Sequence, residues 1–121
     1  MANAAIFIGW GAPIAGREAQ SLQLFQEAVQ HWTRWQQQGE IESFEPVALE
    51  PHGGELGGFC LIKGDRDQLS RLRYSEEWQR LNARAVTIMQ QFGVVDAHIG
   101  EGLQQLFGVY QQATQELAGQ R

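Results

Sequence analysis

Two short segments, residues 4–10 and 58–63, are apolar at almost every position. β-branched and aromatic side chains are frequent in both, and glycine follows each, so we expect two strands. A strand with one solvated face alternates apolar and polar residues, and neither segment does. Both faces of the sheet that contains them must therefore be covered, which limits the folds open to a chain of 121 residues.

Segments in which apolar residues follow helical spacing lie between these strands and two further strand-like segments. Gly39 stands where a helix over 17–38 should end, and Asp65 and Ser75 stand where helix N-caps are expected. A break near Tyr74 divides the second helical region in two. The spacing predicts strands at 4–10, 40–50, 58–63 and 94–99, and helices at 17–38, 65–74, 75–92 and 103–117.

The order β-α-β-β-α-β with an appended helix predicts an α+β fold of the ferredoxin-like type, filling residues 1–121 as one domain. Right-handed crossovers would place the strands in the order 4-1-3-2. Pro46 agrees, because proline is tolerated on an edge strand. Helices can cover only one face of this sheet. We therefore expect a second copy of the chain to cover the other face, in a homodimer.

At this level of pattern the chain resembles small bacterial proteins of the dimeric α+β barrel superfamily. The resemblance rests on the strand order, on the passage Gly58 to Arg66 and on the broken helix Leu72 to Trp78. It implies a dimeric barrel, and the superfamily includes cofactor-free oxygenases, haem-degrading enzymes, lactone isomerases and ligand-binding regulators. No functional motif of a characterised member is matched, so the resemblance assigns no catalytic residue.

Charge and cysteine content exclude several classes of partner. The formal net charge is −5, and the basic residues between 63 and 84 are interspersed with acids. Nucleic acid binding needs an uncompensated basic face, so we do not expect it. The N-terminal apolar run is far shorter than the roughly 18 residues of a membrane span. One cysteine, Cys60, allows no internal disulfide and reads as a small buried hydrophobe, so we expect a cytoplasmic protein.

Asp96 and His98 form the acid/base pair that we would test first. They are two residues apart on a predicted strand, so both point to one face, with Cα atoms about 6.6 Å apart. A carboxylate that orients an imidazole is a simple device for proton transfer near neutral pH. If Val95 and Ala97 face the helices, the pair lies on the open side. An edge-strand polar face or a dimer-interface hydrogen bond is the alternative.

A second candidate site is a pocket for a small apolar or aromatic ligand between helices and sheet. Core packing is the alternative explanation for its aromatic residues. His52 belongs to the glycine-rich segment 51–57, which we expect to be the most mobile internal loop and a lid if the pocket has one. The predicted ligand-binding residues are Trp10, Trp35, His52, Tyr74 and Trp78.

No cofactor is predicted. The three histidines, at 31, 52 and 98, fall on a helix, a loop and a strand without metal-ligand spacing, although a single histidine bound to haem stays open. Gly9, Gly11 and Gly16 stand where a dinucleotide fingerprint would, but Ile14 breaks the pattern. Two functions remain: a small-molecule binding protein or cofactor-independent enzyme with a helix–sheet cleft, and a non-catalytic homodimeric protein-interaction module.

Overall fold

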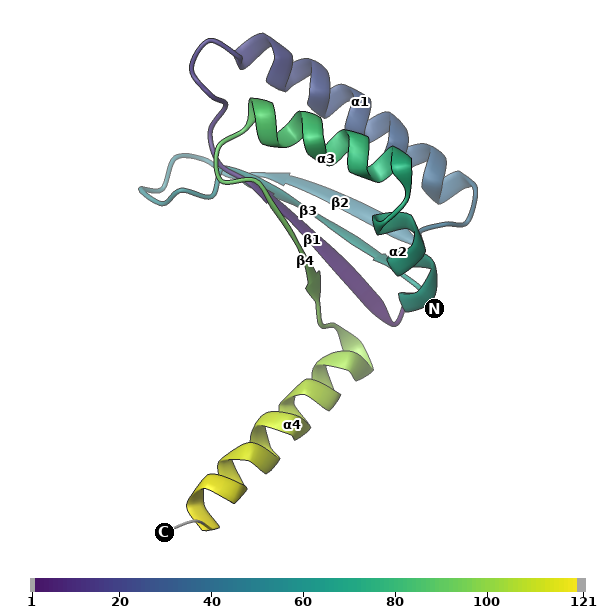
Figure 1. Ribbon diagram of the computed structural model, residues 1–121, viewed down its shortest axis with the longest axis vertical. Helices are drawn as coiled ribbons and strands as arrows, with labels where there is room; N and C mark the ends of the chain where they lie inside the picture. Colours follow the sequence, from purple (N-terminus) through teal and green to yellow (C-terminus); the bar gives the residue numbers. More distant parts are fainter. Residues whose placement is uncertain (1, 120–121) are drawn as a thin grey trace.

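The computed structural model describes residues 2–119 and has the predicted order of elements (Figure 1). A four-stranded antiparallel sheet combines with four helices, which confirms the α+β class. The elements are β1 (Ala4–Trp10), α1 (Glu18–Gln37), β2 (Ser43–Ala48), β3 (Gly58–Gly64), α2 (Arg66–Arg73), α3 (Glu76–Ile88), β4 (Gly93–Ala97) and α4 (Gly100–Gly119).

The strand order is β2-β3-β1-β4, as the crossover rule predicted. Pro46 lies in β2 at the edge of the sheet, where its missing N–H costs no ladder hydrogen bond on the outer side. In the two central strands, β1 and β3, alternate residues point to opposite faces. Ile6 pairs with Ile62 on one face and Phe7 pairs with Leu61 on the other.

Helices α1, α2 and α3 lie on the same face of the sheet, and the core forms between them and the sheet (Figure 1). Ile6, Cys60 and Ile62 are at most 2% exposed there. On the opposite face Phe7 and Leu61 are only half-buried, and Val95 of β4 is 56% exposed. Within residues 2–119 no helix covers this second face. We call the face formed by Phe7, Phe59, Leu61 and Val95 the open face.

The predicted helix caps are present. The Asp65 carboxylate accepts a hydrogen bond from the Gln68 N–H at 3.1 Å, and the Ser75 hydroxyl accepts one from the Trp78 N–H at 3.3 Å. Gly39 has a φ of +77°, the left-handed conformation expected after a helix. These local signals therefore define where α1 ends and where α2 and α3 begin.

The predicted end of the third helix at residue 92 is wrong. The chain leaves the helix at Met89, which has extended backbone angles and pairs with Pro13. Gln90 continues this pairing by accepting a hydrogen bond from the Gly11 N–H at 2.7 Å. Strand β4 ends at Ala97 rather than 99, because Ala97 is opposite Ala5, near the start of β1. Strand β2 is likewise shorter than the predicted 40–50.

Helix α4 continues from the end of β4 and points away from the rest of the molecule (Figure 1). Its first turn lies beside Arg66, whose Nη2 atom is 3.5 Å from the position a Cβ on Gly102 would take. Beyond its N-terminal turns, α4 packs against no other helix or strand in the described chain. No helix among these residues is long and apolar enough to cross a membrane.

Candidate functional site

A cavity of about 90 Å³ lies between α1, α3 and the helix-covered face of the sheet. It sits where the sequence predicted a ligand pocket, and three of the predicted residues line it. Apolar and aromatic side chains form most of its wall. The lining residues are Ile8, Trp10, Ser21, Leu24, Phe25, Ala28, Trp32, Trp35, Trp78, Leu81, Asn82, Ala85, Met89 and Phe92.

The aromatic wall is built from three elements. Trp32 and Trp35 are three residues apart on α1, so both point from one side of the helix. Trp78 lies in the first turn of α3, directly after the Ser75 cap, and stacks on Trp35 with ring centroids 5.5 Å apart and planes 14° apart. Phe25 is 41% exposed and makes an edge contact with Trp10, which places it at the mouth of the cavity.

One fully buried polar group of a lining residue lacks a partner. Trp78 is 2% exposed, and its Nε1 atom is the buried side-chain donor for which the described residues provide no acceptor. The Ser21 hydroxyl contacts the Met89 sulfur at 3.2 Å, and the Asn82 amide also lines the cavity. None of the lining residues ionises near neutral pH. The cavity can bind and orient a molecule, but its side chains cannot act as general acid or base.

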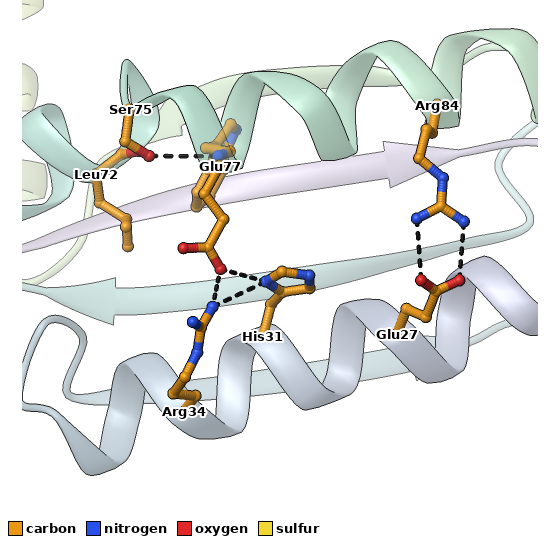
Figure 2. Close-up of polar contacts among 8 residues, drawn as sticks. Glu27, His31, Arg34, Leu72, Ser75, Glu77 and Arg84 are labelled. Atoms are coloured by element: carbon orange, nitrogen blue, oxygen red, sulfur yellow. Dashed lines mark hydrogen bonds and ion pairs between the residues drawn. The ribbon is translucent and has the colours of Figure 1, made fainter.

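Charged residues join α1 to α3 beside the cavity wall (Figure 2). Arg84 of α3 donates two hydrogen bonds to the Glu27 carboxylate of α1, at 3.1 and 2.8 Å, and these bonds lower the pKa of Glu27 and raise that of Arg84. Glu77 of α3 contacts both His31 and Arg34 of α1. We call these five residues the α1–α3 clasp.

Sequence reasoning missed the clasp. It found only that the basic residues between 63 and 84 are interspersed with acids. The local pair Glu76–Arg80 does form, but Arg84 pairs with a residue 57 positions away. The spacing of Glu27, His31 and Arg34 on one side of α1 was the available signal, because four- and three-residue steps align charged groups for a neighbouring helix.

The structure separates Asp96 and His98 from this cavity. Asp96 is opposite Ile6 in the sheet, so it faces the helices, while Val95 faces the open side. The condition that would have put the pair on the open side is therefore not met. The Asp96 carboxylate accepts a hydrogen bond from Arg73 at 2.8 Å, and among the described residues no hydrogen bond joins it to His98. Both line a second, more polar hollow beside α2.

Tyr74 and His52 also lie apart from the cavity. Tyr74 is 66% exposed and lines the hollow beside α2, with the Arg73 guanidinium 5.6 Å from its ring centre. His52 organises its own loop: its Nε2 lies 2.7 Å from the Leu56 carbonyl oxygen, and its Nδ1 accepts from the Gly54 N–H at 3.3 Å. One neutral tautomer, protonated on Nε2, satisfies both contacts.

Cys60 lies in the middle of β3 with no exposed surface. Burial raises the pKa of its thiol to about 12, so the nucleophilic thiolate is scarce at neutral pH. The structure therefore agrees with the expectation of a small buried hydrophobe at this position.

The geometry also bears on metals and cofactors. Across residues 2–119 no three His, Cys, Asp or Glu side chains gather as a metal site would require. No histidine lines the aromatic cavity, so the cavity does not provide the single histidine ligand for haem that the sequence left open. Gly11 has a packing role, because a Cβ there would lie 3.0 Å from two carbonyl oxygens, and Gly16 has a φ of +87° in a turn. These glycines need no nucleotide to explain them.

No family model matches the sequence, and no curated protein matches it. Solved structures do share the fold. A dimeric ferredoxin-like protein of unknown function from Bacteroides fragilis has 10% identity and a TM-score of 0.58. The match covers 80% of this chain and 97% of that protein's chain. A DABB family protein from Mesorhizobium loti has 11% identity, a TM-score of 0.61, and coverages of 80% and 98%.

A variant of SnoaB from Streptomyces nogalater, described as a cofactor-independent oxygenase, has 12% identity and a TM-score of 0.56, with coverages of 82% and 97%. The protein thus has the ferredoxin-like α+β fold, with a cavity between helices and sheet. The predicted ferredoxin-like fold is confirmed, and two of the solved neighbours with this fold are described as dimeric.

Proposed function

We propose that the protein binds a small, planar, largely apolar molecule in the cavity between α1, α3 and the sheet. The observation that carries this proposal is that Trp78, which lines this largely apolar cavity, has a buried indole N–H without an acceptor among the described residues. A buried donor without an acceptor costs about 1–3 kcal/mol. A ligand with one acceptor atom would remove that cost, while its ring would pack against the indole rings of Trp32 and Trp35.

The size of the cavity limits the ligand. A dry cavity of about 150 Å³ accommodates benzene, and the cavity here is about 90 Å³. Binding of even a single ring therefore requires displacement of a side chain at the mouth. Phe25 suits this role, because its partial exposure leaves it room to move. The ligand we propose is a ring compound with one acceptor, and a larger one requires further opening between α1 and α3.

The chemistry of the lining favours binding over acid/base catalysis. A reaction in this cavity would have to take its proton transfers from the ligand or from water, because no lining residue ionises near neutral pH. We propose that such a reaction uses no resident cofactor. The shared fold with SnoaB, a cofactor-independent oxygenase, is compatible with it.

We assign the protein to the cytoplasm, since one buried thiol suits a reducing compartment.

Pyridine and benzene provide a matched test, because they differ mainly in the ring acceptor. Pyridine at pH 8, but not benzene, is expected to shift the Trp78 indole N–H resonance downfield. In Trp78→Phe the ratio of pyridine affinity to benzene affinity should fall about fivefold, the loss of a hydrogen bond worth about 1 kcal/mol. Tyr74→Phe, outside the cavity, should leave the ratio unchanged.

Two results would overturn the ligand proposal. One is the absence of binding by either probe up to millimolar concentration, and the other is an unchanged ratio in Trp78→Phe. Native mass spectrometry of the purified protein adds an independent measurement, because it detects a co-purifying molecule together with the mass of the assembly.

The second function that an observation favours is a homodimeric protein-interaction module. We propose that two copies associate through the open face, where Phe7 stacks on Phe59 at 5.3 Å and Val95 is largely exposed. An isologous contact suits this face, because the same apolar patch meets itself across a two-fold axis. Neighbours of the same fold are described as dimeric, which supports this assembly. The assembly is compatible with either function.

A further inference from the structure

Helix α4 carries an apolar stripe that packs on no other helix or strand among residues 2–119 of its own subunit. The stripe follows the 3-4-3-4 spacing of a helix that packs along a seam. Phe107 flanks it, and most of these side chains are strongly exposed, with 62% at Phe107, 65% at Tyr110 and 71% at Leu117. The stripe consists of Leu103, Leu106, Tyr110, Ala113 and Leu117.

The composition of α4 does not support a free helix. Between Gly100 and Gly119 the only charged residues are Glu101 and Glu116, so no ion pairs of opposite charge form along it. Gly108 in its middle costs about 1 kcal/mol relative to alanine. Most helical stability in proteins comes from packing of an apolar face. The exposed stripe of α4 therefore requires a covering surface.

The stripe lies next to the open face along the chain. Val95 of β4 belongs to the open face, and α4 begins three residues after β4 ends at Ala97. Figure 1 shows that α4 extends beyond the sheet rather than folding back onto it. A second subunit seated on the open face therefore comes within reach of α4.

The areas agree with this arrangement. One side of a 20-residue helix, about 30 Å long and 10 Å wide, presents about 300 Å². Four strands about 4.8 Å apart and five residues long present about 300 Å² more. Together they approach the roughly 800 Å² that each partner contributes to a stable complex. The open face alone falls well short of it.

The solved neighbours support an added role for α4. The protein from Mesorhizobium loti is covered over 98% of its length, yet it covers 80% of this chain. The uncovered fifth is similar in length to α4, which follows the last strand of the shared fold. The match in length agrees with a helix added to the shared fold.

We propose that α4 is an exchanged arm: its apolar stripe packs on the partner subunit of the homodimer and extends the open-face contact. The proposal rests on the homodimer proposed above. Each arm crosses to the other subunit, so the two-fold axis repeats the contact. The occupant of the stripe is a second copy of this chain.

Photo-crosslinking tests where the arm lies. Full-length protein with Tyr110→p-benzoylphenylalanine is mixed with an equal amount of ¹⁵N-labelled wild-type chain, equilibrated and irradiated. Mass spectrometry then identifies the isotope of the linked peptide. We expect links from position 110 to ¹⁵N-labelled peptides. Links confined to the subunit that carries the photo-crosslinker, or no links in a dimer, would overturn the arm and leave the open-face dimer standing.

Sedimentation equilibrium adds the energetic test. Tyr110→Glu should weaken the dimer at least tenfold, because it places a charge in the stripe. Gln115→Glu adds the same charge on the opposite side of α4 and should change the dissociation constant less than twofold. Equal effects would overturn the arm. A wild-type chain that sediments as a monomer at micromolar concentration would overturn both the arm and the open-face dimer.

Discussion

The His31 ring lies between two charged groups of the α1–α3 clasp. Arg34 lies 3.0 Å from the His31 Nδ1 atom, and Glu77 contacts the same atom. A single ring nitrogen cannot accept from the guanidinium and donate to the carboxylate together. Burial, followed by the charge of Arg34, lowers the pKa of His31, so the neutral ring accepts from Arg34. Arg84 acts in the same direction and Glu27 opposes it.

This assignment predicts how stability depends on pH. Below about pH 6.5 a histidine in the unfolded chain binds a proton, whereas the folded chain binds it only at lower pH. The free energy of unfolding therefore falls as the pH falls from 7.5 to 5.5, and this contribution is lost in His31→Gln. Urea unfolding at both pH values should show a smaller decrease for His31→Gln than for wild type, with the exposed His98→Gln as control. An unchanged decrease would contradict a neutral His31.

At the scale of elements, the junction between α2 and α3 depends on one hydroxyl. Ser75 accepts from the Trp78 N–H at 3.3 Å and donates to the Leu72 carbonyl at 2.6 Å, so it caps α3 and closes α2. Ser75→Ala is expected to lower the free energy of unfolding by about 1 kcal/mol. Chemical denaturation measures this change. Ser70→Ala, on an exposed position inside α2, should be nearly neutral, and equal losses would refute the capping role.

The same elements show what the sequence could predict. A helix cap depends only on residues close to it in the sequence. The starts of α2 and α3 and the end of α1 could therefore be predicted from Asp65, Ser75 and Gly39. Pro46 correctly indicated an edge strand. The end of α3 was not readable, because Met89 leaves the helix to pair with Pro13, a residue 76 positions earlier in the chain.

The candidate site divides in the same way. Trp10, Trp35 and Trp78 were identified because large aromatic residues on amphipathic elements must point into the space between helices and sheet. The Asp96–His98 pair was chosen on strand spacing alone. Arg73, which binds Asp96, lies 23 residues away on α2, and no local pattern indicates that contact. Which indole N–H would lack an acceptor depends on the whole core, so Trp78 could not be singled out in advance.

At the scale of the whole molecule, the open face is tested by a charge at its centre. Leu61 pairs with Phe7 on this face, whereas Ile8 is 6% exposed in the helix-covered core, so Leu61 is the informative position. Leu61→Glu should weaken the dimer a hundredfold or more, since burying an unpaired charge costs at least about 3 kcal/mol. Sedimentation measures the dissociation, and circular dichroism verifies that the subunit stays folded.

Two further variants separate burial from local repulsion. Leu61 lies opposite Glu45 of β2, so Leu61→Glu also places two like charges side by side. Leu61→Lys removes that repulsion and should still dissociate the dimer. Gln79→Glu adds the same charge on the exposed side of α3 and should leave the dimer intact. A dimer that survives both Leu61 variants would exclude the open face as the interface.

The position of Cys60 makes this chain convenient for chemical labelling. Its thiol is buried in the central strand β3 and is almost fully protonated at neutral pH, so maleimide reagents should not modify it in the folded protein. A cysteine introduced on α4 or at the cavity mouth would then be the preferred site of modification. Spin labels or fluorophores can thus report on the arm and the cavity without prior removal of the natural cysteine.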